Sequence, residues 1–130
     1  MGFFDVFKKS NTSKDNIVMW LEAVDNAYSR AFQVKNAVGL GEYLTRGCLV
    51  KQMERIRMNE KAYAGLERYK HVKWEKSSSS NDVVVYFKIV TYDQVKMSRG
   101  IVAPVGDNYT ERWEIIVENG LRKVAEIRRV

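Results

Sequence analysis

The chain has 130 residues, of which 45% are hydrophobic and 12% are aromatic, so it holds enough apolar material for one folded domain and is not expected to be disordered. Its 22 basic and 16 acidic residues leave a net charge of +6, which permits contact with nucleic acid or anionic lipid without requiring either. No apolar run is long enough to span a bilayer.

The cysteine content and the first residues bear on the compartment. Cys48 is the single cysteine, so no intramolecular disulfide can form, and a lone thiol is typical of a reducing compartment. Lys8 and Lys9 follow the first apolar residues instead of preceding them, which does not fit a secretory signal peptide. We therefore expect a cytoplasmic protein.

Residues 1–13 are predicted to be a flexible segment and linker ahead of a single folded domain, residues 14–130. Residues 1–9 combine bulky apolar side chains with two lysines, and a polar stretch follows them. Such a segment suits weak peripheral contact with an anionic membrane, or with a groove on a partner. The alternative is that its phenylalanines fold back onto the domain and extend the core.

The helical pattern comes first along the chain. At residues 14–35 apolar side chains recur at three- and four-residue steps, which predicts a long amphipathic helix after a cap at Thr12 or Ser13. A second helical region is expected at residues 40–61, divided by Gly47. The apolar stripe of the first helix is rich in aromatic residues: Trp20, Tyr28 and Phe32.

After Gly65 the apolar period changes from helical to alternating, which predicts strands. Both residues of Asn119–Gly120 tolerate positive φ, so this pair predicts a two-residue type I′ hairpin turn. A polar turn is expected at residues 77–82. The predicted strands are residues 66–76, 83–92, 95–103, 109–118 and 121–130.

Helices followed by hairpin-connected strands indicate an α+β fold, with N-terminal helices packed against an antiparallel sheet of four to five strands. One face of the sheet must be buried, and the aromatic stripe of the first helix is the expected cover. On the strand at residues 83–92 we expect the core side to hold Val83, Val85, Phe87 and Ile89.

Three features resemble the nuclear transport factor 2-like superfamily: the end of the long helix, residues 26–31 (NAYSRA), the short helix pair around residues 40–45 (LGEYLT), and the closing hairpin, residues 111–127 (ERWEIIVENGLRKVAEI). The spacing is also similar to the branch related to the peripheral subunit of the mitochondrial import motor. The resemblance implies a cone-shaped, cystatin-like domain whose sheet is curved. Because the superfamily includes isomerases, dehydratases, transport factors and binding modules, it implies no single function.

A ligand pocket is one interpretation of the aromatic residues, and an ordinary core is the other. Glu111 shares strand parity with Trp113 and is therefore predicted to point toward the core side, where a carboxylate can act as a general acid or base. The alternative is that Glu111 lies at the mouth of the strand and reaches solvent. The predicted pocket residues are Trp20, Tyr28, Phe32, Phe87, Glu111 and Trp113.

Other chemistry-bearing residues predict little. His71 is the only histidine, and one His with one Cys is a poor metal-ligand set, so no metal and no cofactor is expected. No phosphate-binding glycine loop or nucleophile elbow is present. The closing hairpin is basic but lacks interleaved exposed aromatics, so nucleic-acid binding is not expected. Its basic residues are Arg112, Arg122, Lys123, Arg128 and Arg129.

We therefore expect a non-catalytic binding or assembly module that holds a protein partner or a small apolar ligand, and that forms a homodimer through its exposed sheet face. The alternative is an isomerase or dehydratase with Glu111 as general base and Tyr28 or Tyr109 as hydrogen-bond donor. The predicted dimer contacts, taken from the strand parity opposite the core, are Tyr86, Val90, Tyr92 and Ile116.

Overall fold

A computed structural model describes residues 2–58, 70–93 and 108–130, with the backbone alone for residues 2–15. The order of elements confirms the predicted α+β class, because the helices precede a four-stranded antiparallel sheet of order β1-β2-β3-β4. The elements are α1 (Gly2–Val34), the 3-10 helix η1 (Val38–Leu40), α2 (Arg46–Met58), β1 (Lys70–Ser80), β2 (Val83–Tyr92), β3 (Tyr109–Glu118) and β4 (Leu121–Arg129).

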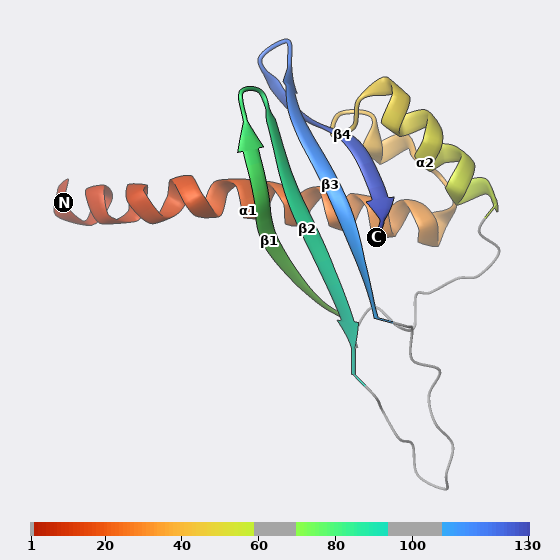
Figure 1. Ribbon diagram of the computed structural model, residues 1–130, viewed down its shortest axis with the longest axis horizontal. Helices are drawn as coiled ribbons and strands as arrows, with labels where there is room; N and C mark the ends of the chain where they lie inside the picture. Colours follow the sequence, from red (N-terminus) through yellow and green to blue (C-terminus); the bar gives the residue numbers. More distant parts are fainter. Residues whose placement is uncertain (1, 59–69, 94–107) are drawn as a thin grey trace, which may run out of the picture.

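The long helix α1 crosses one face of the sheet, and α2 lies beside β4 (Figure 1). The segment between η1 and α2 is attached to β4 through its backbone. Thr45 N donates to Val124 O at 3.0 Å, and Val124 N donates to Tyr43 O at 2.8 Å. These bonds place the start of α2 against the edge strand of the sheet.

The core lies between the helices and the face of the sheet that α1 covers, which we call the inner face. α1 contributes residues at helical spacing, as its apolar stripe predicts. β3 contributes Trp113 and Ile115, both almost fully buried, which confirms the predicted parity of that strand. The buried core residues from these elements and from β4 are Leu21, Val24, Tyr28, Ala31, Trp113, Ile115, Val124 and Ile127.

Of the two predicted hairpin turns, the one at Asn119–Gly120 is confirmed and the one at residues 77–82 is partly wrong. Asn119 and Gly120 have φ angles of 53° and 76°, as the predicted two-residue turn requires. The polar turn predicted at residues 77–82 is wrong in its first part, because β1 continues to Ser80 and pairs with Val83, after a register shift beyond Lys76. The serines can adopt the extended conformation of a strand, and pairing with β2 satisfies their backbone hydrogen-bonding groups.

The helix boundaries also differ from the prediction. α1 begins at Gly2, so Thr12 and Ser13 do not cap it, and the backbone of the expected linker is helical. The polar residues there interrupt the apolar period, but no proline or glycine breaks the helix. Gly47 is the second residue of α2 rather than a break between two helices. The predicted strand at residues 95–103 and the start of the one at 66–76 lie outside the described residues.

The predicted faces of β2 are reversed. Tyr86 and Val90 are 7% and 0% exposed and lie on the inner face, so the prediction that they form an exposed dimer contact is wrong. Tyr92 shares their parity, whereas Phe87 pairs with Arg112 on the outer face and therefore cannot line an inner pocket. Apart from Lys88 and the exposed Thr91, both faces of β2 carry apolar or aromatic side chains, and the lysine makes the inner row resemble a solvent-facing one.

Candidate functional site

A buried lysine lies at the centre of the inner face. The Lys88 ammonium donates a hydrogen bond to Oδ1 of Asp25 on α1, and lies 3.6 Å from Oε1 of Glu111 on β3. The side chains of Lys88 and Glu111 are 1% and 2% exposed. Charges at this depth are stable only when each has an opposite partner. The inward orientation predicted for Glu111 is therefore confirmed, and the solvent-facing alternative is wrong.

A second lysine completes the ionic cluster. Lys70 Nζ, at the start of β1, lies 3.7 Å from Asp25 Oδ2 and donates to Ser29 Oγ at 3.1 Å. Asp25 thus lies between two ammonium groups. The cluster, defined as Asp25, Lys70, Lys88 and Glu111, holds two carboxylates and two ammonium groups and is electrically balanced.

Aromatic rings surround the Lys88 ammonium. It lies 5.4 Å from the ring centroid of Tyr28, 6.0 Å from that of Tyr109 and 5.7 Å from that of Trp113, within the range of cation–π attraction. Trp113 Nε1 also donates to Glu111 Oε1 at 3.2 Å. The rings exclude water from the ion pairs, which strengthens each pair relative to one at the surface.

Burial sets the protonation of the nearby phenols. It raises the pKa of Tyr28 well above the usual 10.0, and the negative charge of Glu111 adds to the shift. Burial, with a smaller contribution from Glu111, raises the pKa of Tyr109 in the same direction. Both phenols are therefore neutral at physiological pH and available as hydrogen-bond donors.

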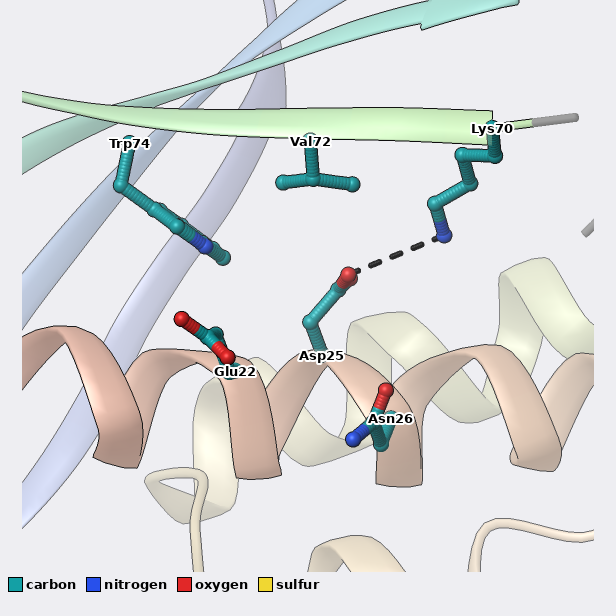
Figure 2. A pocket seen from close by; sticks show the side chains of 6 residues that line it. All are labelled: Glu22, Asp25, Asn26, Lys70, Val72 and Trp74. Atoms are coloured by element: carbon teal, nitrogen blue, oxygen red, sulfur yellow. Dashed lines mark ion pairs between the residues drawn. The ribbon is translucent and has the colours of Figure 1, made fainter. Parts of the chain in front are cut away.

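A pocket of about 350 Å³ opens between α1 and β1 beside the cluster. Figure 2 shows the Asp25–Lys70 ion pair at one end, Trp74 above Glu22 at the other, and Val72 between them on the strand. The Trp74 ring packs edge-on against the ring of Trp113, with ring centroids 5.0 Å apart, so the pocket wall is continuous with the core. This volume falls in the range of small-ligand sites. The six lining residues are Glu22, Asp25, Asn26, Lys70, Val72 and Trp74.

The residues predicted to line a pocket are only partly brought together. Tyr28, Glu111 and Trp113 meet around Lys88. Phe32 packs edge-on against Tyr28 with ring centroids 5.0 Å apart, and Trp20 packs edge-on against Tyr43 with ring centroids 6.4 Å apart. None of these residues lines the pocket between α1 and β1, and Phe87 lies on the opposite face of the sheet.

The sequence pattern did not predict that Lys88 and Asp25 are charged partners in the core, although it held evidence for Lys88. An inward carboxylate at Glu111 requires a cation, and Lys88 is the only charged residue of β2. Asp25 follows Val24 at the edge of the apolar stripe of α1, but its partners on β1 and β2 are too distant in the chain for any local pattern to show.

The remaining candidate residues lie outside the cluster. His71 and Asp93 form an exposed pair at 2.8 Å, with each side chain 61% exposed. Cys48 is buried, and burial raises the pKa of its thiol to about 11. Among the residues that the structure describes, no group of three or more His, Cys, Asp or Glu side chains is placed to hold a metal ion. Within the same ranges, none of the helices has the length and hydropathy needed to cross a membrane.

Comparisons of the chain with protein-family models, with known proteins and with solved structures found no match. A functional assignment therefore has to come from the geometry of the pocket and the cluster.

Proposed function

We propose that this protein is a non-catalytic binding module that holds a small ligand in the pocket between α1 and β1. The pocket itself is the observation that carries the proposal. It sets two apolar side chains, Val72 and Trp74, opposite polar and charged side chains of α1, so a ligand can make both apolar and polar contacts there. The Asp25–Lys70 ion pair holds one end of the pocket in place before a ligand enters.

The isomerase or dehydratase alternative has less support. A general base must reach the proton that it removes from a substrate. Oε1 of Glu111 instead accepts the Trp113 N–H bond and faces the Lys88 ammonium at 3.6 Å. Glu111 is not among the residues that line the pocket between α1 and β1. The arrangement around Glu111 therefore suits a role in holding α1 on the sheet better than a role in catalysis.

We further propose that the fold is related to the nuclear transport factor 2-like superfamily. The order of elements supports this relation, since helices precede an antiparallel sheet and the long first helix crosses one face of that sheet (Figure 1). A cone-shaped domain of this kind would enclose a pocket between its first helix and its sheet. An experimental structure with a flat sheet would contradict the relation.

The ligand-binding proposal is tested by filling the pocket from its exposed side. Asn26 lines the pocket from an exposed position of α1, so Asn26→Phe places a ring in it at little cost to the core. Gln33→Phe is the matched control, because Gln33 is exposed on the same helix and does not line the pocket.

A library of cationic, neutral and anionic small molecules would be screened by two-dimensional NMR on the labelled protein. We expect hits that shift the amide signals of Val72 and Asn26 in the wild type, and that bind the Gln33→Phe variant but not the Asn26→Phe variant. A library without hits, or hits that bind both variants equally, would overturn the proposal.

The outer face of the sheet supports a second candidate function, assembly into a homodimer. Phe87 and Ile89 of β2, with Ile116 of β3, lie there half-buried. Around them three basic and three acidic side chains pair with one another, so these six charges cancel and do not oppose contact with a second copy of the chain. The basic members are Lys73, Arg112 and Arg128, and the acidic members are Glu75, Glu114 and Glu126.

Sedimentation analysis over a concentration range tests the homodimer. Phe87→Glu places a charge at the centre of the outer face and is expected to dissociate the dimer. Val50→Glu introduces the same charge at a 57%-exposed position of α2 and should leave the dimer intact. A wild type that stays monomeric at high concentration would remove this second function without affecting the ligand pocket.

A further inference from the structure

We infer that the ligand of the pocket is a small organic cation, an amine or ammonium group joined to an apolar body. The inference rests on the proposed binding function and names the chemical class that the pocket selects. It is carried by two observations: which charged side chains of the lining are already paired, and where the remaining carboxylate lies relative to Trp74.

Two of the three charged side chains that line the pocket, Asp25 and Lys70, already form ion pairs. Lys70 pairs with Asp25 and donates to Ser29, and Asp25 also accepts the Lys88 hydrogen bond. Glu22 makes no ion pair with any side chain that the structure describes, in residues 16–58, 70–93 and 108–130. The charge that the pocket can offer an incoming ligand is therefore the negative charge of Glu22.

The neighbour of this carboxylate is an indole. Figure 2 shows the Glu22 carboxylate on α1 below the Trp74 ring on β1, at the same end of the pocket. A cation between them would meet a carboxylate on one side and the electron-rich ring on the other, the pairing that recognises ammonium ligands. Val72, next along the strand, would contact the apolar body of the ligand.

An anionic ligand fits the same pocket poorly. The cation available to it is Lys70, and taking that lysine would withdraw a partner from Asp25, whose side chain is only 9% exposed. Removing one partner from a buried ion pair leaves an uncompensated charge, which is strongly unfavourable. The anion would also lie in the same pocket as the Glu22 carboxylate.

Three probes with a common phenyl body and different head groups test the class: phenethylamine, phenethyl alcohol and hydrocinnamate. At neutral pH these carry a positive, a zero and a negative charge. We expect the amine to bind about three- to thirtyfold more tightly than the alcohol, from one ion pair and one cation–π contact. Binding of the amine should weaken as salt is added, whereas binding of the alcohol should not.

Glu22→Gln identifies the carboxylate responsible. Since Glu22 is exposed, we expect the variant to bind the amine about two- to fivefold more weakly and the alcohol unchanged. Glu42→Gln is the matched control, because it removes the same charge from an exposed residue outside the pocket. Equal weakening in both variants would attribute the effect to net charge and overturn the inference.

The outcomes also separate this inference from the function on which it rests. If hydrocinnamate or the alcohol binds in the pocket as tightly as the amine, the pocket is a ligand site but not one for cations, and only the inference fails. If neither these probes nor any member of the wider library shifts the pocket signals, the binding function fails with it.

Discussion

Removing the buried ammonium of Lys88 is the sharpest perturbation of this fold. Lys88→Met keeps an unbranched side chain of similar length. Among the described residues it leaves Glu111 with only the Trp113 N–H bond and Asp25 with only Lys70 as an ionic partner. Breaking a buried ion pair from one side costs about 3–5 kcal/mol. Against a total stability of about 5–15 kcal/mol, that loss would lower the melting temperature by roughly 10–20 °C.

A double-mutant cycle separates the ion pair from the loss of packing. Glu111→Gln alone leaves Lys88 paired with Asp25, so we expect a smaller cost, about 1–2 kcal/mol. In the Lys88→Met/Glu111→Gln double variant no unpaired carboxylate remains at position 111. Its loss of stability should therefore fall short of the sum of the single losses by about 1–3 kcal/mol.

The measurement is urea unfolding followed by circular dichroism and tryptophan fluorescence. Lys73→Met is the matched control, because Lys73 is 73% exposed and pairs with an exposed Glu75, so its loss should change stability by less than about 0.5 kcal/mol. If Lys88→Met costs less than about 1 kcal/mol, or if the two single losses simply add, the ion cluster does not hold α1 on the sheet and this reasoning is refuted.

Three further outcomes follow from the same structure. Because burial raises the pKa of Tyr28 and Tyr109 above 10.0, the unfolded chain loses these protons first and stability falls as pH rises above 10.0; absorbance at 295 nm should show both phenols ionising only as the fold is lost. Burial raises the pKa of Cys48 to about 11, so a thiol reagent at pH 8 should label it slowly until urea is added, and fast native labelling would contradict its burial. Gly120→Ala forces a side chain onto a φ of 76° and should cost about 1 kcal/mol by urea unfolding; an unchanged midpoint would mean that the turn adjusts.

Local patterns predict the order of the described elements and the bounds of two strands, but not every helix and turn boundary. The alternating period placed β2 and β3 at residues 83–92 and 109–118, and Asn119–Gly120 marked the turn into β4. The polar residues after Lys9 predict a linker and a helix cap at Thr12 or Ser13, but backbone propensity allows the helix to extend back to Gly2.

The candidate site was only partly accessible from the sequence. Glu111 was placed on the correct face because β3 alternates cleanly, with Trp113 and Ile115 fixing its parity. The pocket could not be predicted in this way. Its walls come from α1 and β1, and the contact between those elements depends on how the helix crosses the sheet (Figure 2). A local apolar period identifies a buried stripe on each element but not the element that covers it.

The reversed faces of β2 follow from the same limit. A lysine in an apolar strand normally marks the solvent side, since lysine is almost never fully buried unless it is paired. Here the pairing comes from Asp25 on α1 and Glu111 on β3, so Lys88 is buried and Phe87 is turned outward.

The buried charges also constrain how the elements assemble. Lys88 can be neutralised only when α1 lies across β2 with Asp25 facing it and β3 is in the register that pairs Lys88 with Glu111. A slip of one residue in that register would bury Phe87 in place of Lys88 and leave both carboxylates without this partner. An apolar core would tolerate such a slip far better than these ion pairs do. The cluster therefore selects the arrangement of α1 and β1 that also forms the pocket, and ties the proposed binding site to the correct fold.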